Sequence, residues 1–339
     1  MRVLVTGAAG LIGGEICARL VARGHDVTAL VHRKAAICDN AGRAVAGITV
    51  VQGDITRPHL GLSALPEVDF VVHSAAITAF DAPAAAYESV NIAGTARAID
   101  LARACGAAFV HVSTAYVCGK SDGIIAESDV GSDFVNGYEA SKAVGEALVR
   151  GSGLRFAIGR PSIVVGDSAT GAISRFENIY MIFRLIAENR VKTLPAAPDS
   201  SLDLVPIDHV AGGIVAMVER FNAVSGQTLH LVGASPTPIS RIGAAIAAVP
   251  GLGAPHFVAP DAFDPATLPP VERRYHAAAA ALYTSYLLRN PRFDTANARE
   301  FGLKCPPTDR EWLDRLIGFA IESGFVTAHR GRTAPVPSV

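Results

Sequence analysis

The chain has 339 residues, enough for one large domain or two smaller ones. Its 30 basic and 31 acidic residues nearly cancel, which argues against a broad electrostatic surface for nucleic acid or anionic lipid. Five scattered cysteines, none in a CxxC pattern, favour neither a disulfide framework nor a metal site. We therefore expect a small-molecule partner, no nucleic acid and no metal.

The first residues, MRVLVTGAAG, lack the long apolar segment and the cleavage site of a signal peptide. No run reaches the ~18 to 20 apolar residues of a membrane-spanning helix, because even the Ala-rich run from His276 to Leu288 contains polar residues and stops at Arg289. These features predict a cytoplasmic protein with no transmembrane segment.

A strand, a glycine turn and a helix are predicted at the start of the chain. Arg2 to Val5 is an apolar run, the turn TGAAGLIG follows, and helical periodicity covers 15–23. In such a turn the glycines allow a tight bend and a close approach of a pyrophosphate, and free N–H groups face the anion. The predicted cofactor contacts here are Gly7, Ala9, Gly10, Leu11, Ile12 and Gly13. The alternative is a glycine-rich turn without a ligand.

The second predicted strand, 27–31, ends in His32-Arg33-Lys34 and has no acidic residue at its end. A carboxylate there would hold the ribose 2′-OH of NAD, whereas Arg33 and Lys34 can pair with the 2′-phosphate of NADP. The sequence therefore predicts NADP (NADPH) rather than NAD. The alternative is that both are solvated loop charges.

Two further strands, 48–51 and 68–72, lead to other cofactor contacts. Asp54 and Ile55 follow the third strand, where they can meet the adenine, although Asp54 can instead cap the next turn. Ala75 and Ala76 follow the fourth strand and are small enough to let a cofactor pass close to the backbone. We assign His73 no chemical role.

A helix predicted over 84–105 contains Asn91, a strand over 109–112 leads to Thr114, and Tyr138 and Lys142 follow on another helix. Four residues apart, Tyr138 and Lys142 lie on one helix face. A cation beside a phenol stabilises the phenolate and lowers its pKa from about 10, so the pair can exchange a proton. By itself, a YxxxK pattern more often marks a packed tyrosine and a solvated lysine on a surface helix.

Six motifs occur together in order: TGAAGLIG, GDI, HSAA, VNIAGT, STAYVCG and YEASK. Over roughly residues 1–165 the chain thereby resembles the extended short-chain dehydrogenase/reductases. The resemblance implies an α/β Rossmann-type fold, with a doubly wound parallel sheet and a smaller, mostly helical C-terminal substrate lobe. It implies that Tyr138 transfers a proton at the substrate oxygen, Lys142 lowers its pKa and holds the nicotinamide ribose, Thr114 orients the oxygen, and Asn91 supports a water-linked proton path.

A narrower resemblance, to fatty acyl-CoA reductases and thioester-reductase domains, rests on five segments: FVHVSTAYVCG, NGYEASKAVGEALV, GRPSIVVG, LDLVPIDHVAGGIVAMV and PRFDT. It implies NADPH-dependent reduction of an acyl group bound to CoA or to a carrier, or of the derived aldehyde. We expect the acyl group to arrive on CoA or on a separate carrier. No cysteine nucleophile is implied.

Alternatives within the fold are a dehydrogenase acting on a ketone or alcohol and a nucleotide-sugar epimerase. Such an epimerase could use Arg175, Arg184 and Arg241 to hold a diphosphate, but scattered arginines are more often surface charges. A further alternative is a non-catalytic NADP-binding regulator. The family resemblance suggests a homodimer built on helices 84–105 and 136–150.

The second half of the chain is expected to divide between two domains. A strand over 153–159 leads to Pro161, Ser162 and Ile163 in a loop over the nicotinamide. We assign 1–166 plus about 203–233 to the NADP-binding domain, and about 167–202 plus 234–326 to the substrate-binding lobe. Residues 327–339 have no apolar periodicity and are expected to be a flexible tail.

Overall fold

The computed structural model describes residues 1–33 and 36–328, and the chain divides into two compact units. The first unit contains Met1–Arg175, Asp203–Pro236 and Pro291–Thr308, and the second contains Phe176–Leu202, Thr237–Asn290 and the chain from Asp309. Lys34 and residues 329–339 of the expected tail lie outside the described residues.

The observed division differs from the expected one at residues 167–175, 234–236 and, most extensively, Pro291–Thr308, all of which were expected in the second unit and belong to the first. Two contacts account for the place of Pro291–Thr308. The strand β15 (Pro291–Phe293) pairs in parallel with β6 (Gly123–Ile125). The buried carboxylate of Glu127 accepts hydrogen bonds from the backbone N–H of Asn297 at 2.6 Å and of His230 at 2.7 Å.

A seven-stranded parallel sheet forms the centre of the first unit, in the order β12-β7-β5-β4-β1-β2-β3. Its strands are β1 (Arg2–Thr6), β2 (Asp26–Val31), β3 (Thr49–Gln52), β4 (Phe70–His73), β5 (Ala108–Val112), β7 (Phe156–Pro161) and β12 (Thr228–Leu231). The inner strands are rich in Val, Leu and Ile and buried on both faces, as parallel strands covered by helices must be. The predicted Rossmann-type fold is confirmed.

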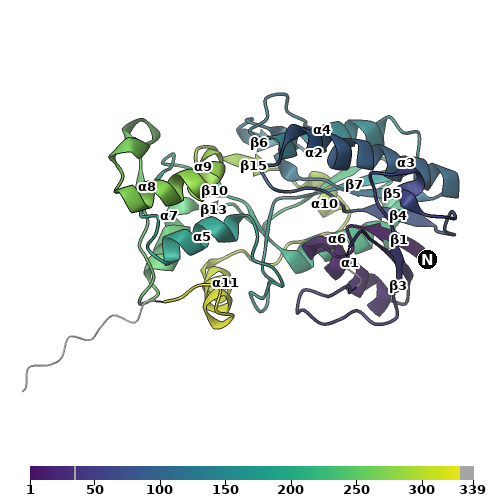
Figure 1. Ribbon diagram of the computed structural model, residues 1–339, viewed down its shortest axis with the longest axis horizontal. Helices are drawn as coiled ribbons and strands as arrows, with labels where there is room; N and C mark the ends of the chain where they lie inside the picture. The colour runs from purple at the N-terminus through teal and green to yellow at the C-terminus, as the bar shows by residue number, and fades with distance from the viewer. Residues whose placement is uncertain (34–35, 329–339) are drawn as a thin grey trace, which may run out of the picture. The chain divides into compact units, whose positions relative to one another are not determined.

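Helices cover both faces of this sheet (Figure 1). On one face, α1 (Leu11–Ala22) and α6 (Ile207–Glu219) bury an apolar cluster that includes Ile16 and Ile214. On the other face, α3 (Ala93–Cys105) and α4 (Gly137–Arg150) contribute Leu101 and Val149 to a second cluster.

The chain reverses its direction across the sheet between β1 and β4. After β1, α1 leads to β2 on one side, whereas the later strands β4, β5, β7 and β12 lie on the other side. In open α/β sheets a ligand binds at such a point, outside the carboxyl ends of the strands. The fold therefore places the turn after β1 and the turn after β4 next to each other.

Short elements complete the first unit. They are α2 (Ala84–Ala86), the π-helical turn η2 (Tyr87–Ile92), the 3-10 turns η1 (Pro58–Gly61), η3 (Ala115–Cys118) and η4 (Phe221–Ala223), the strands β8 (Ile163–Val165) and β11 (Leu204–Pro206), and α10 (Ala296–Glu300). The helix expected over 84–105 is thus interrupted by a π-turn that contains Asn91. The loop expected at Pro161 to Val164 is mostly strand, because β8 pairs in parallel with β11.

The second unit consists of helices and two small sheets, β10 with β13 and β9 with β14. Its elements are α5 (Ile179–Ala187), β9 (Thr193–Pro195), β10 (Ser201–Leu202), β13 (Thr237–Pro238), α7 (Ile239–Ala247), β14 (His256–Val258), η5 (Pro260–Ala262), η6 (Pro265–Thr267), α8 (Pro270–Tyr275), the π-turn η7 (His276–Ala280), α9 (Ala281–Leu287) and α11 (Arg310–Glu322). Throughout residues 1–33 and 36–328, no helix has both the length and the apolar character needed to cross a membrane.

Candidate cofactor site and active site

The glycine turn after β1 has room for backbone only. Gly7 has a φ of +68°, and a Cβ added to it would lie 2.6 Å from the backbone nitrogen of Ala75. A Cβ on Gly13 would lie 2.2 Å from the carbonyl oxygen of Gly7. Gly10 is the N-cap of α1 and supplies no side-chain cap, and the first turn holds no acidic residue. The first N–H groups of α1 and its positive dipole end therefore suit a phosphate.

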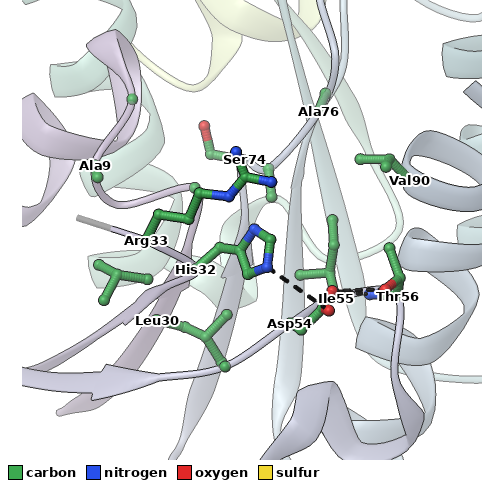
Figure 2. A pocket seen from close by; sticks show the side chains of 15 residues that line it. Ala9, Leu30, His32, Arg33, Asp54, Ile55, Thr56, Ser74, Ala76 and Val90 are labelled. Carbon is green, nitrogen blue, oxygen red and sulfur yellow. Dashed lines mark hydrogen bonds and ion pairs between the residues drawn. The ribbon is translucent and has the colours of Figure 1, made fainter. Parts of the chain in front are cut away.

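A pocket of about 470 Å³ lies at the carboxyl ends of β1 to β4 (Figure 2). Of the predicted cofactor residues, Gly7, Ala9, Gly10, Arg33, Asp54, Ile55, Ala75 and Ala76 line it. The prediction omitted Leu30, Val31, His32, Gly53, Thr56, Ser74 and Val90, which also line it. His32, Gly53, Thr56 and Ser74 each flank a predicted residue. Extending every predicted contact by one position along the chain would therefore have found these four.

Leu11, Ile12 and Gly13, which form the first turn of α1, are not among the lining residues. Pro161, Ser162, Ile163, Tyr138 and Lys142 do not line this pocket either. They belong to a second group of predicted residues, around the carboxyl ends of β5 and β7.

Asp54 caps a turn at the pocket wall. Its Oδ1 accepts hydrogen bonds from the N–H of Thr56 at 2.8 Å and from the Thr56 hydroxyl at 2.7 Å. These bonds hold the pKa of the Asp54 carboxyl below its ordinary value, so the group is ionised at neutral pH. The capping role, left open by the sequence, is therefore present in the structure.

Two arginines lie near the glycine turn between β1 and α1, which is called the phosphate turn from here on. Figure 2 shows the Arg33 side chain reaching across the pocket toward Ser74. Arg175, from the segment after β8, donates a hydrogen bond from Nη2 to the carbonyl oxygen of Ala9. Ala9 and Arg33 both line the pocket, whereas Arg175 contacts the turn through the Ala9 carbonyl oxygen.

The segment that carries Arg175 is fixed by Asn40. Nδ2 of Asn40 donates to the carbonyl oxygen of Ala172 at 2.8 Å, and Oδ1 accepts from the N–H of Ser174 at 3.1 Å. The backbone N–H of Asn40 in turn donates to Glu15 of α1 at 2.8 Å. The sequence treated Arg175 as one of several scattered arginines, because this long-range attachment leaves no local signal.

Thr114 and Tyr138 belong to the second group and lie within hydrogen-bonding reach of each other. The Thr114 hydroxyl donates to the carbonyl oxygen of Pro161 at 3.4 Å and accepts from the N–H of Tyr116 at 3.3 Å. Burial raises the pKa of Tyr138 to about 12, and a hydrogen bond with Thr114 acts in the opposite direction. The sequence assigned this lowering effect to Lys142, whereas Thr114 is the group that opposes the rise.

Lys142 points from α4 toward strand β5. Its Nζ donates to the carbonyl oxygen of Val112 at 2.7 Å and lies 3.4 Å from Nε2 of His111. Burial lowers its pKa to about 8, and the charge of Glu146 acts in the opposite direction. Glu146 itself forms a bidentate ion pair with buried Arg160, with N···O distances of 2.8 and 2.7 Å. Among the described residues, the nearest carboxylate on this face of α4 is thus engaged by Arg160 rather than by the ammonium of Lys142.

Asn91 connects the π-turn to α4. Its Oδ1 accepts from the N–H of Ile77 at 2.8 Å, and its Nδ2 donates to the Ile77 carbonyl at 3.0 Å and to the Ser141 hydroxyl at 2.8 Å. Ser141 immediately precedes Lys142, so Asn91 fixes the part of α4 that carries the lysine.

The chain belongs to the family described as Male sterility protein, whose model matches residues 5–214. This confirms the predicted membership of the extended short-chain dehydrogenase/reductases, in their thioester-reductase group, and the predicted class of NAD(P)-dependent oxidoreductase. The structure of the chain is similar to the crystal structure of the terminal R domain from the myxalamid PKS-NRPS biosynthetic pathway. The two share 26% identity and superpose with a TM-score of 0.81 over 96% of this chain and 92% of that one.

Two relatives represent different kinds of protein. A linear gramicidin synthase of Brevibacillus parabrevis is 33% identical over 218 residues, which are 59% of this chain and 4% of that protein. The 2-alkyl-3-oxoalkanoate reductase of Shewanella oneidensis is 26% identical over 311 residues, which are 84% of this chain and 73% of that protein. The chain thus spans a small part of the first relative and most of the second.

Proposed function

We propose that the chain is an NADPH-dependent reductase of a thioester, with the acyl group carried on CoA or on a separate carrier, or of the aldehyde formed from it. The observation that supports this best is the cluster of Thr114, Tyr138 and Lys142 at the carboxyl ends of β5 and β7, in the same unit as the cofactor pocket. The similarity to the terminal R domain of a PKS-NRPS pathway supports a carrier-bound substrate.

The phosphate turn fits a dinucleotide, because an uncapped helix N-terminus and Cβ-free glycines leave space and N–H donors for a diphosphate. Arg33 supports NADPH over NADH, because a guanidinium group pairs well with a phosphate. NADPH, when bound, supplies the hydride. Arg33 lies within the pocket, and Arg175 stiffens the turn through the carbonyl oxygen of Ala9.

Tyr138 supplies the proton in this scheme. With a pKa of about 12, its phenol is protonated at neutral pH and ready to donate when the substrate oxygen gains charge. Thr114, hydrogen-bonded with Tyr138, orients the same oxygen. Lys142, with a pKa of about 8, is mostly cationic at neutral pH and stabilises the negative charge that develops.

The bond changes balance for a thioester. Hydride adds to the carbonyl carbon, and the Tyr138 proton goes to the oxygen, which gives a hemithioacetal. The C–S bond then breaks, and the hydroxyl proton leaves as the thiol takes one up, which gives an aldehyde and a free thiol. No cysteine of the chain is needed. A second reduction of the aldehyde would use the same three residues.

A second candidate is reduction of a ketone in a 3-oxo acid. The observation that favours it is the length over which the chain matches a 2-alkyl-3-oxoalkanoate reductase, 73% of that protein. The same Thr114, Tyr138 and Lys142 would serve this reaction, in which no C–S bond breaks. The substrate therefore has to be determined by assay.

The experiment is a parallel assay of NADPH absorbance with five substrates: an acyl-CoA, an acyl-carrier thioester, an aldehyde, a 2-alkyl-3-oxoalkanoate and a nucleotide sugar. We expect turnover of a thioester with release of thiol. Turnover of the oxo acid alone would select the second candidate, and turnover of the nucleotide sugar alone would contradict both. NADPH binding without any turnover would favour a non-catalytic regulator.

A further inference from the structure

Two buried histidines lie side by side under the active site, on neighbouring strands. His73 ends β4 and His111 lies in β5, and their rings stack with centroids 5.6 Å apart and an interplanar angle of 18°. Both are 0% exposed. Burying an imidazole costs free energy unless its nitrogens find hydrogen-bond partners, so each ring requires an explanation.

His73 is explained by packing. Its Nδ1 lies 2.8 Å from the hydroxyl of Thr6, and its Nε2 lies 3.1 Å from the hydroxyl of Thr95. The Thr95 hydroxyl donates to the carbonyl oxygen of Asn91 at 2.6 Å, so it accepts from His73, and Nε2 carries the proton. Both nitrogens are satisfied by hydroxyl groups, as in a structural core histidine.

His111 is different. Its Nε2 lies 3.4 Å from Nζ of Lys142, and its Nδ1 has no hydrogen-bond partner within residues 1–33 and 36–328. An ammonium can only donate, so Nε2 must be the acceptor and the ring proton must lie on Nδ1. Burial and the neighbouring charge of Lys142 hold the pKa of His111 far below its ordinary value, which keeps the ring neutral. The geometry thus gives this ring one polar contact, the lysine.

We propose that His111 is a positioning residue, whose neutral Nε2 holds the ammonium of Lys142 against strand β5. This inference rests on the proposed function, because it assigns a task to the lysine of that site. The ammonium has three N–H donors. Val112 and His111 accept two of them on the side of β5, which leaves the third for a ribose hydroxyl or the substrate.

A neutral acceptor has an advantage over a carboxylate at this position. It offsets part of the free-energy cost of desolvating the buried ammonium, and it does not neutralise the positive charge as a carboxylate would. Glu146 is one helical turn away, but its charge is engaged by Arg160. The titratable and charged groups near Lys142 are His73 on β4, His111 on β5, Tyr138, Glu139 and Glu146 on α4, and Arg160 on β7.

The test measures the protonation of Lys142 directly, by NMR of its side-chain carbon and nitrogen during a pH titration. In His111→Leu the ammonium loses an acceptor, so we expect the pKa of Lys142 to fall from about 8 by about one pH unit. His111→Gln, which keeps an acceptor oxygen, should restore most of the shift. His73→Leu is the matched control, because it removes an equally buried imidazole that does not contact Lys142.

Once a substrate is known, the decrease of kcat at alkaline pH should shift together with the pKa of Lys142 in each variant. An unchanged Lys142 titration in His111→Leu, or an equal shift in His73→Leu, would overturn the proposal. Because the titration needs no substrate, a failure to find turnover would count against the proposed function alone.

A measurement on the wild-type protein covers the case in which His111→Leu does not fold. At about pH 6.5, where Lys142 is charged, the imidazole ¹⁵N shifts of His111 should report a protonated Nδ1 and an unprotonated Nε2. A protonated Nε2 would contradict the assigned contact.

Discussion

The hydroxyl of Ser162 donates a 2.6 Å hydrogen bond to Oδ1 of Asp203, which also accepts the backbone N–H of Gly233 at 2.7 Å. Ser162 lies between β7 and β8, the segment predicted to meet the nicotinamide. Asp203 is 3% exposed, and burial raises its pKa to about 6 against the opposing effect of these hydrogen bonds. The residue that fixes this segment is therefore itself sensitive to pH.

We predict that Asp203 makes the protein less stable as pH rises from about 4 to about 6. The folded state binds the proton more tightly than an unfolded carboxyl of pKa near 3.9, so stability is fully present below the unfolded pKa and is lost as the folded group ionises. A shift of about two units corresponds to about 3 kcal/mol.

Urea unfolding at several pH values measures this effect in the wild type and in Asp203→Asn. The variant cannot ionise at this position, so the difference in unfolding free energy between the two proteins should change across this pH interval. Exposed Asp261→Asn serves as the control and should follow the wild type. If Asp203→Asn kept the wild-type pH dependence, Asp203 would not be the group that titrates.

Tyr138→Phe should lose turnover by about 10² to 10⁴-fold, because it removes the proton donor, and should still bind NADPH. Fluorescence of bound NADPH and steady-state kinetics measure the two properties separately. Tyr87→Phe is the matched control: the Tyr87 hydroxyl donates to the carbonyl oxygen of Ala79, and Tyr87 is none of the three proposed reacting residues. It should reduce stability by about 1 kcal/mol and leave kcat nearly unchanged. Wild-type turnover by Tyr138→Phe would remove Tyr138 from the mechanism.

Arg33→Ala should raise the Kd for NADPH by roughly 10 to 100-fold and leave the Kd for NADH nearly unchanged, because a charged hydrogen bond to the 2′-phosphate is lost. Arg175→Met tests the same side of the phosphate turn. Arg43→Ala removes an exposed arginine that pairs with Asp39 and should change neither Kd. Isothermal titration with both cofactors measures all three variants. An equal loss for NADPH and NADH in Arg33→Ala would contradict selection of the 2′-phosphate.

Gly13→Ala should abolish NADPH binding and lower stability, because the new Cβ would lie 2.2 Å from the carbonyl oxygen of Gly7 and must displace the phosphate turn. Gly212→Ala in α6 is the matched control. Its Cβ would lie 3.7 Å from the end of the Arg19 side chain, an ordinary contact, so the better helix propensity of alanine should raise stability by about 0.5 to 1 kcal/mol. Normal NADPH affinity in Gly13→Ala would show that the turn tolerates this displacement.

The sequence predicted the elements whose signals are local. The apolar run, the glycine turn and the helical period that follow one another from Arg2 specify β1, the phosphate turn and α1 within a single stretch. The strands predicted over 27–31, 48–51, 68–72, 109–112 and 153–159 were also located, with ends that differ by up to three residues. The spacing of Tyr138 and Lys142 drew attention to them, but their proposed roles, like that of Thr114, rest on the family motifs and remain predictions.

Features that depend on distant partners were missed. The short strands β8 and β15 exist because each pairs with a segment far away in the chain, β11 and β6. The π-turn at Asn91 accompanies bonds to Ile77, 14 residues earlier, and to Ser141, 50 residues later. His111 looks like any residue of a buried strand until the fold brings Lys142 beside it, across 31 positions.

The central claim is that hydride from NADPH reaches the carbonyl carbon of a thioester and that Tyr138 supplies the proton. The most direct test gives the wild type NADPH deuterated at the transferable position, together with an acyl-CoA or acyl-carrier thioester, and analyses the products by mass spectrometry. We predict an aldehyde with one deuterium on its carbonyl carbon, one free thiol for each NADPH oxidised, and neither product with Tyr138→Phe. An intact thioester, with deuterium transferred only when a 2-alkyl-3-oxoalkanoate is added and found in the alcohol formed from it, would contradict the claim.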